Sequence, residues 1–266
     1  MSNLPNLAGN LKCWRNLNKL AFGDSVSCPG CGSSLQENYR SGYLWCCTCR
    51  KKYRTTAYRG SWLYGMKLQP RQLFALLWAW QNKKSPDTAR LLASVSYTTV
   101  QRWYYRFRQQ LPDTSLMLDG AVQVDESYFG RLKSKQPQLI VTGAIAKNRN
   151  VALRITNTRS QEALEQFVQD VVKPGSLVLT DKWYAYEELP LLGYHHEACN
   201  HSQGHFGPTN EIEGFWSILK RHLRKLYGCI PTIHLEPILN EWAARQNRPS
   251  LFASPENYLR VTVVPC

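Results

Sequence analysis

The sequence predicts an α/β domain that follows a cysteine-rich module and a helical segment. Three observations support this prediction. Six of the nine cysteines lie in residues 1–60, apolar residues recur at helical spacing over residues 69–111, and short apolar strands alternate with helices over residues 119–200. We therefore divide the chain into three segments, residues 1–60, 61–114 and 115–266.

The composition favours a globular protein with a polyanionic partner. Apolar residues make up 43% of the chain, which excludes a disordered protein, and the formal net charge is +14. Nucleic acid is the commonest partner of so basic a chain. The longest apolar run, residues 73–80, is far shorter than the ~20 residues that span a bilayer, so we expect no membrane partner. Because the N-terminus lacks a signal-peptide pattern, we expect a cytoplasmic protein whose cysteines bind metal.

Two Cys-x-x-Cys pairs predict a zinc ribbon in the first segment. Each pair turns two thiolates to one side, and two pairs complete the tetrahedral shell that Zn²⁺ prefers. The ligands would be Cys28, Cys31, Cys46 and Cys49. Cys47 could replace one of its neighbours, and buried or disulfide-linked cysteines are the alternative interpretation. With four thiolate ligands the zinc would be structural, and the basic residues that follow suit phosphate contacts: Arg50, Lys51 and Lys52.

Three helices are expected in the second segment, in the order of a helix-turn-helix. The first covers Gln69–Gln81, the second is capped by Ser85, and the third covers Tyr97–Gln110. The third helix has short polar residues near its start, which suit base edges, and arginines, which suit phosphates. Its DNA-binding residues would be Thr98, Thr99, Gln101, Arg102 and Arg106. A plain helical hairpin with a solvated basic face is the alternative.

The third segment has the element order of a ribonuclease-H-like fold. Three strands are expected first, followed by a helix, a strand, a short helix, a strand and a long helix. In chain order these elements cover residues 121–125, 139–145, 151–156, 160–172, 176–181, 184–189, 194–198 and 210–226. The first strand ends on Asp125 and the fourth on Asp181. Since ligand sites of open α/β sheets lie beyond the carboxyl ends of the strands, we expect both carboxylates in one site.

Carboxylates gathered in this way point to divalent cations. They repel one another unless cations neutralise them, and hard oxygen ligands select Mg²⁺ or Mn²⁺. Two such ions about 3.5–4 Å apart can activate an attacking oxygen and stabilise a leaving oxygen in a phosphoryl displacement. A single aspartate at a strand end is usually a cap, but two of them with a glutamate on a later helix favour a metal site.

The chain resembles the insertion-sequence DDE transposases related to the Merlin elements, the ISXO-like group. The resemblance covers nearly the whole length. Its motifs are the Cys-Pro-Gly-Cys of the ribbon, Val124–Gly130, Thr180-Asp181, Thr209–Lys220 and the Asn-Arg-Pro at 247–249. It implies a bacterial enzyme, associated with the nucleoid when it acts, that cuts and joins DNA with a metal-binding acidic triad.

By this resemblance, Asp125, Asp181 and Glu213 form the triad, and Lys220 is the basic residue that follows it. Glu213 and Lys220 lie two helical turns apart, so they share one helix face. Some relatives use Asn as the third residue, and Asn210 lies one turn before Glu213. We prefer Glu213 because a third anionic ligand suits two Mg²⁺ ions better, and Asn210 remains the alternative.

Several neighbouring residues need separate interpretation. Glu126 follows Asp125 and, if the strand continues, points to the opposite face of the sheet. Gln123, Lys182 and Pro208 depart from the family's pattern, which leaves the fit of the DNA ends open. Four histidines precede the last helix, and we interpret them as loop residues or phosphate contacts, with a second zinc site as the alternative: His195, His196, His201 and His205.

The resemblance implies DNA transposition. The N-terminal modules would bind the terminal inverted repeats of the element, and water, then a freed 3′ hydroxyl, would attack DNA at the acidic site. Because transposition joins two DNA ends, a homodimer on double-stranded DNA is expected, with residues 243–248 contacting DNA or the second subunit. The alternatives are a DNA-binding protein without catalysis, derived from such an enzyme, and a nuclease of the same fold.

Overall fold

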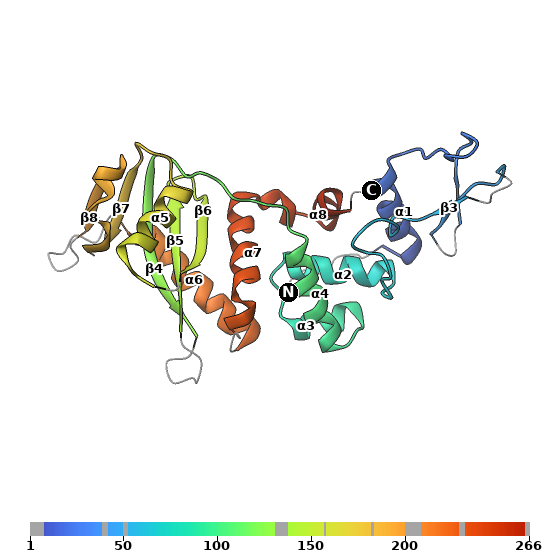
Figure 1. The fold of residues 1–266 in the computed structure, drawn as a ribbon. Helices are drawn as coiled ribbons and strands as arrows, with labels where there is room; N and C mark the ends of the chain where they lie inside the picture. Colours follow the sequence, from blue (N-terminus) through green and yellow to red (C-terminus); the bar gives the residue numbers. More distant parts are fainter. Residues whose placement is uncertain are drawn as a thin grey trace. The chain divides into compact units, whose positions relative to one another are not determined.

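The computed structural model forms two compact units (Figure 1). The first combines residues 1–112 with residues 250–266, and the second consists of residues 113–249. The structure describes residues 8–38, 42–49, 53–130, 138–156, 158–181, 184–199, 209–228 and 232–263. None of the helices in these ranges combines the length and the hydropathy that a membrane span needs.

The first unit begins with a helix that the sequence did not predict. Helix α1 covers Asn10–Phe22 and is followed by a small antiparallel sheet of β1 (Gln36–Glu37), β2 (Leu44–Trp45) and β3 (Arg54–Thr55). Asparagine is a poor helix former, and its presence in α1 obscures the helical pattern. Asn18 is nevertheless buried, where its amide donates to the Gly42 carbonyl and accepts from the Ala57 N–H. This asparagine therefore ties α1 to the segments that flank β2 and β3.

The three helices of the second segment form at nearly the predicted residues. They are α2 (Pro70–Gln81), α3 (Pro86–Ala93) and α4 (Tyr97–Gln109). Their starts follow from capping. The Ser85 hydroxyl accepts the Thr88 N–H, the Ser96 hydroxyl accepts the Thr99 N–H, and Gln69 forms a reciprocal capping box with Gln72.

The C-terminal helix α8 (Pro255–Thr262) completes the core of this first unit. Tyr258 is fully buried among the rings of Trp62, Trp80 and Phe107, and its hydroxyl donates to the Phe107 carbonyl. The side chain of Gln81 donates to the carbonyls of Leu251 and Ser254, next to the 3₁₀ turn η5 (Pro249–Phe252). Residues 250–263 thus pack with the helices that precede the sheet domain.

The second unit is built on a mixed five-stranded sheet. Its strands are β4 (Ala121–Phe129), β5 (Leu139–Ala146), β6 (Val151–Thr156), β7 (Leu177–Asp181) and β8 (His195–Cys199). Their order across the sheet is β6-β5-β4-β7-β8. The first three pair antiparallel, and β7 and β8 are parallel to β4.

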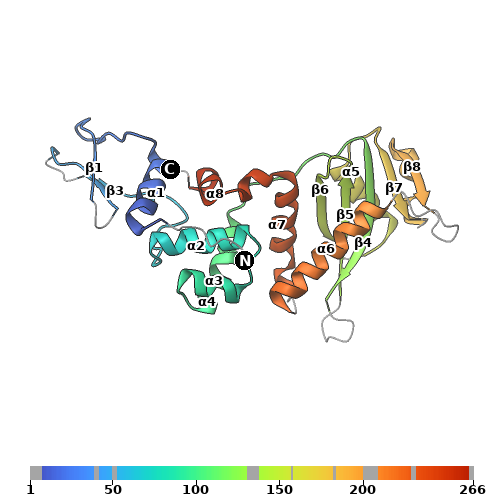
Figure 2. The same cartoon turned by 180° about the vertical axis from the view of Figure 1, so that it is seen from behind.

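Helices cover both faces of this sheet (Figures 1 and 2). Helix α5 (Gln161–Val171) packs on one face, and α6 (Asn210–Tyr227) packs on the other with α7 (Leu235–Asn247). Short 3₁₀ turns complete the unit: η1 (Tyr184–Tyr186), η2 (Leu189–Leu192) and η4 (Thr232–His234). The two faces have separate cores, with Val122 and Val124 facing α5, and Phe129 and Val141 facing α6.

Two expectations about these elements need correction. Strand β4 does not end at Asp125 but continues to Phe129, because residues 126–129 pair with β5. The short helix expected over residues 184–189 consists of the separate turns η1 and η2. Within residues 243–248, Gln246 and Arg248 are exposed, so contact with DNA or a second subunit stays a prediction for them. Arg245 forms an almost fully buried ion pair with Glu241 at 2.8 Å, and Asn247 bonds to Val151 and Thr114. These two side chains hold α7 inside its own unit.

Candidate functional site

The strand register sets the two aspartates side by side. Strand β4 pairs in parallel with β7 up to the Gln123–Leu179 pair, and Asp125 and Asp181 each lie two residues further along. Strand β7 ends at Asp181, whereas β4 continues. Because parallel strands in register bring equivalent positions to one level, the two carboxylates occupy the same edge of the β4–β7 pair.

Helix α6 brings the third carboxylate and the lysine. Its N-terminus is held by Gln123 of β4, whose Oε1 accepts the N–H groups of Glu211 at 3.0 Å and Ile212 at 3.1 Å. The Thr209 hydroxyl donates to Oε1 of Glu213 at 3.0 Å. Gln123 thus serves as an acceptor for helix N–H groups that have no partner within the helix.

Trp216 joins α6 to Asp125. Its indole Nε1–H donates to Oδ2 of Asp125 at 3.1 Å. This contact was not predicted from the sequence, because Trp216 appears there only as part of an apolar helix face. The position of Trp216 could have indicated the contact, because a buried tryptophan needs a hydrogen-bond acceptor and Trp216 lies one helical turn from Glu213.

The electrostatics show that the acidic groups share one environment. Burial, followed by the negative charges of Glu126, Asp181 and Glu213, raises the pKa of Asp125 to about 6. Burial and the nearby Arg224 lower the pKa of Lys220, while the charge of Asp125 raises it. Asp181, Glu213 and Lys220 are therefore each close enough to Asp125 for their charges to interact with its carboxylate.

Glu213 and Asn210, the two candidates for the third ligand, differ little in exposure. Glu213 and Asn210 are both exposed on the first turns of α6, where a metal ion or DNA has access. The charge of Glu213 contributes to the raised pKa of Asp125, whereas Asn210 carries no charge. Lys220 is half-buried, with its Nζ 5.3 Å from the centre of the Phe129 ring. Lys182 and Pro208 lie outside the described residues.

Glu126 lies on the opposite face of β4 from Asp125, as strand alternation predicts. Its side chain is only 2% exposed, and its Oε2 accepts hydrogen bonds from Arg159 Nη2 at 2.6 Å and Nε at 2.8 Å. The hydroxyl of Tyr186 in η1 donates to the other oxygen. Burial and Glu126 raise the pKa of Tyr186 well above its usual value, so this hydroxyl keeps its proton. Glu126 is therefore a fully bonded core carboxylate.

The four predicted zinc ligands form a compact cluster. The Sγ atoms of Cys28, Cys31, Cys46 and Cys49 all lie within 4.8 Å of one another. A tetrahedron with Zn–S distances of about 2.3 Å has edges of roughly 3.8 Å, so the cluster fits Zn²⁺. Hydrogen bonds from the backbone and side chain of Ser33 and from Cys46 lower the pKa of Cys31 to about 7, which favours the thiolate that a metal requires. Cys47 is exposed and lies outside this cluster.

The cysteines are gathered more tightly than the carboxylates. Within the described ranges, they form the one group of three or more His, Cys, Asp or Glu side chains placed to hold a metal ion. His195 and His196 form no such group, because His196 bonds to the Thr180 hydroxyl at 2.9 Å and His195 is exposed. His201 and His205 lie outside the described residues.

The predicted DNA-binding residues of α4 fall into two groups. Thr98, Gln101 and Arg102 are exposed, and Thr99 also bonds to the Ser96 cap. Arg106 is different, because its guanidinium donates to the Trp62 carbonyl and lies 4.6 Å from the centre of the Trp103 ring. This arginine has a packing role in the first unit. Arg50, Lys51 and Lys52 lie outside the described residues.

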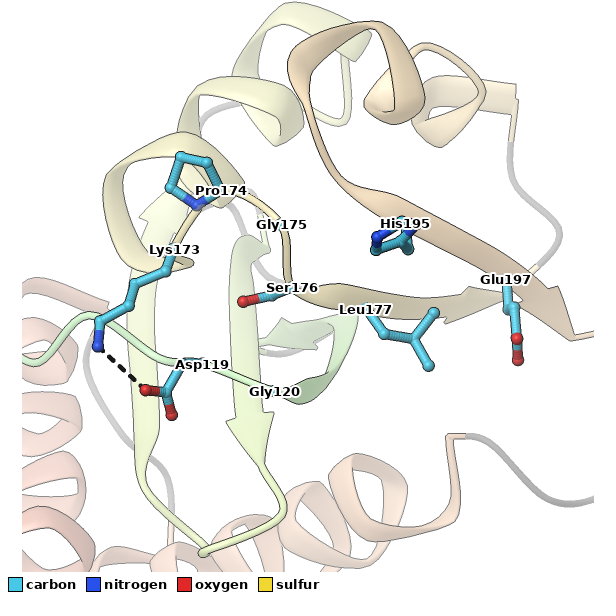
Figure 3. Close-up of a pocket in the computed structure, with 9 residues that line it drawn as sticks. All are labelled: Asp119, Gly120, Lys173, Pro174, Gly175, Ser176, Leu177, His195 and Glu197. Atoms are coloured by element: carbon cyan, nitrogen blue, oxygen red, sulfur yellow. Dashed lines mark hydrogen bonds and ion pairs between the residues drawn. The ribbon is translucent and has the colours of Figure 1, made fainter.

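A separate pocket of about 620 Å³ opens on the second unit (Figure 3). It lies where β4, β7 and β8 begin, beside the ion pair between Lys173 and Asp119 at 3.0 Å. Asp125 and Asp181 lie further along the same strands and do not line it. The pocket is therefore distinct from the acidic site.

The mixed sheet, its order and its helices on both faces fit a ribonuclease-H-like fold with acidic residues at one sheet edge. The family model of the ISXO2-like transposase domain matches residues 117–247. An "Uncharacterized transposase-like protein" of Haemophilus influenzae (strain ATCC 51907 / DSM 11121 / KW20 / Rd) is 37% identical over 97 residues, which are 35% of this chain and 76% of that protein. The chain belongs to the ISXO2-like transposase family.

A solved structure of a viral integration complex also aligns with the chain. It is the cryoEM structure of the simian T-cell lymphotropic virus intasome in complex with PP2A regulatory subunit B56 gamma. The alignment covers 68% of this chain and 75% of that chain, with 13% identity and a TM-score of 0.36. A similarity this low supports no argument about the present chain.

Proposed function

We propose that this protein is a DNA transposase that binds the ends of its element and catalyses metal-dependent strand cleavage and strand transfer. The observation that carries the proposal is the shared environment of Asp125, Asp181 and Glu213 at one sheet edge, in a chain of a transposase family. A protein that only binds DNA has no use for a half-buried aspartate whose pKa is raised by burial and by its acidic neighbours.

The three carboxylates are the residues that would hold two Mg²⁺ or Mn²⁺ ions, with Asn210 as the alternative third ligand. Their hard oxygen atoms suit these cations. Burial and neighbouring negative charges raise the pKa of Asp125, so a bound cation would stabilise its ionised form. When bound, such ions activate the attacking oxygen and stabilise the leaving one. In each step one P–O bond forms and another breaks, first with water as nucleophile and then with the freed 3′ hydroxyl.

The exposed face of α6 is proposed to guide the DNA strand. Lys220, Arg221 and Arg224 follow Glu213 on this helix, and the last two are exposed. In the part of the chain that the structure describes, none of the three forms an ion pair with an acidic side chain. Lys220 and Arg224 are like charges one helical turn apart, an arrangement that destabilises a helix surface, and a polyanionic ligand would relieve their repulsion.

The first unit is proposed to recognise the terminal inverted repeats. Residues 1–60 would contribute a zinc ribbon held by structural Zn²⁺ and residues 61–114 a helix-turn-helix, while catalysis belongs to the remainder. The exposed residues at the start of α4, Thr98, Gln101 and Arg102, are the proposed base and phosphate contacts, with Arg50, Lys51 and Lys52 as further phosphate contacts. The active form would be a homodimer on double-stranded DNA at the bacterial nucleoid.

The proposal is tested by Mg²⁺-dependent cleavage and strand transfer on labelled DNA that carries the element's ends. We expect joined product from the wild type and none from Asp181→Ala or Glu213→Ala. Asn210→Ala should retain product if Glu213 is the third ligand. Glu162→Ala, which removes an exposed carboxylate from α5, is the matched control and should remain active.

Other outcomes select the alternatives. Cleavage without joined product would indicate a nuclease of the same fold. Tight DNA binding without any product from the wild type would indicate a DNA-binding protein derived from a transposase. Loss of product in Asn210→Ala but not in Glu213→Ala would make Asn210 the third ligand.

A further inference from the structure

Trp216 reaches into the acidic site from the core between α6 and the sheet. Its side chain is buried, at 4% exposure, and its ring packs edge-on against Phe129 with 6.0 Å between ring centres. Its Nε1–H, which needs an acceptor in this apolar setting, donates to Oδ2 of Asp125 at 3.1 Å. The acceptor is a carboxylate, so the hydrogen bond is charge-assisted when Asp125 is ionised.

Gly143 makes room for this ring. It lies directly opposite Asp125 in the β4–β5 register. A Cβ atom at this position would stand 2.6 Å from Cζ2 and 2.7 Å from Cη2 of Trp216, closer than real Cβ contacts allow. Glycine weakens a strand interior, and a common reason for its presence is the close approach of another group. The indole of Trp216 is that group.

We propose that Trp216, seated on Gly143, is a positioning residue for Asp125 in the acidic site. The inference rests on the proposed function, because it assumes that Asp125 is a cation ligand. An aspartate side chain rotates broadly about its last torsion angle. A hydrogen bond to Oδ2 fixes that angle and leaves Oδ1 to face a cation from one direction. Hydrogen-bonded partners of this kind typically change metal affinity about 10–100-fold when removed.

The role predicts a separable effect on metal affinity. Trp216→Phe keeps an aromatic ring but removes the N–H donor, and should weaken Mn²⁺ binding about 10–100-fold. Gly143→Ala should do the same by displacing the ring, and should also lower the melting temperature. In the double variant, phenylalanine lacks the Cζ2–Cη2 edge that would collide with the new methyl group. The double variant should therefore regain thermal stability over Gly143→Ala while Mn²⁺ affinity stays low.

The measurement is Mn²⁺ binding to the full chain at fixed pH, followed by the electron paramagnetic resonance signal of free Mn²⁺, beside calorimetric melting. Trp242→Phe is the matched control, because it removes similar volume from the same core without touching Asp125. It should bind Mn²⁺ like the wild type.

Three results would overturn the inference. If folded Trp216→Phe binds Mn²⁺ as tightly as the wild type, Trp216 and Gly143 have only a packing role. The same follows if the double variant regains Mn²⁺ affinity together with thermal stability. An equal loss of affinity in Trp242→Phe would have the same meaning. A failure of the proposed function gives a different result. The wild type and Asp181→Ala would then bind Mn²⁺ equally, or neither would bind it, and the inference would be wrong as well.

Discussion

At the scale of single residues, neighbouring carboxylates on β4 have opposite environments. Asp125 faces α6, and burial, followed by the negative charges of Glu126, Asp181 and Glu213, raises its pKa to about 6. Glu126 faces α5, where Arg159 and Tyr186 satisfy both its oxygens. Strand alternation alone predicts this division. The partners were not predictable, because Trp216 and Arg159 meet β4 only through the packing of helices distant in sequence.

The raised pKa of Asp125 predicts a pH-dependent penalty on stability in the absence of Mg²⁺ and Mn²⁺. The pKa of Asp125 is about 6 in the folded state and about 3.9 in the unfolded state, so folding favours the protonated acid. The free energy of unfolding therefore falls as the pH rises from about 4 to about 6, and it stays low at higher pH. Asp125→Asn should remove this penalty and raise the free energy of unfolding by about 2 kcal/mol at pH 8, less at pH 5. Urea unfolding at both pH values tests this, and an equal gain at pH 5 and pH 8 would contradict it.

The buried ion pair between Arg159 and Glu126 predicts that replacing Arg159 lowers the free energy of unfolding far more than replacing Arg154. Arg159→Met leaves the buried Glu126 charge without its cation and should cost about 3–5 kcal/mol. Arg154→Met breaks a pair with Asp170 in which both side chains are about 40% exposed, and should cost less than about 1 kcal/mol. Calorimetric or urea unfolding at pH 7 measures both losses. Similar losses in the two variants would show that the burial of Glu126 does not determine how much its ion pair stabilises the fold.

At the scale of elements, α6 has two functions in one helix. Its apolar face, which includes Ile212, Leu219 and Leu223, packs on the sheet, and its other face carries Glu213 followed by the cations. Apolar periodicity predicts the helix to within one residue at its end, because the pattern is long and continuous. Helix α1 has an equally real apolar face, but its asparagines serve contacts that exist only after folding.

The cations of α6 predict a change in the salt dependence of DNA binding. Arg221→Gln combined with Arg224→Gln should lower the slope of log affinity against log salt by about 2, because each phosphate contact contributes about 0.9. Lys147→Gln combined with Arg149→Gln removes the same charge from the exposed turn between β5 and β6, and should leave the slope nearly unchanged. Equal slopes for the two double variants would argue against a strand path along α6.

The ribbon predicts one structural zinc ion with a defined ligand set. Cys28→Ser or Cys46→Ser should lower the zinc content of the purified protein from one ion per chain toward none, because a tetrahedral site loses one of its four ligands. Cys47→Ser, next to a ligand but outside the cluster, should keep the metal. Atomic absorption measures the content, and metal loss in Cys47→Ser would revise the ligand set.

At the scale of the whole molecule, the two compact units interleave in sequence. The first is built from both ends of the chain, and the second occupies residues 113–249 between them. The sequence indicated the sheet domain through its alternating strands and helices. It did not indicate that α8 belongs with α2 and α4, because a short amphipathic helix can pack on any apolar surface and its partners lie far away in sequence.

The packing of α8 predicts that a change near the C-terminus destabilises the first unit. Tyr258→Ala removes a fully buried ring and its hydrogen bond to Phe107, and should cost about 3–5 kcal/mol. Tyr64→Ala, at a side chain that is 76% exposed in the same unit, should change stability by less than about 0.5 kcal/mol. Calorimetry should show the loss in one melting transition while the transition of the sheet unit stays in place.

The interleaved order of the two units also determines whether a single proteolytic cut releases a fragment. A single cut between residues 112 and 113 severs one connection, yet the N-terminal fragment would still hold α8, which is covalently attached to the other fragment. The two fragments should therefore co-purify as a nicked complex, held together by the buried contacts of Tyr258. Release of a free fragment would require a second cut near residue 249, so the sheet unit behaves as an insertion that one break does not detach.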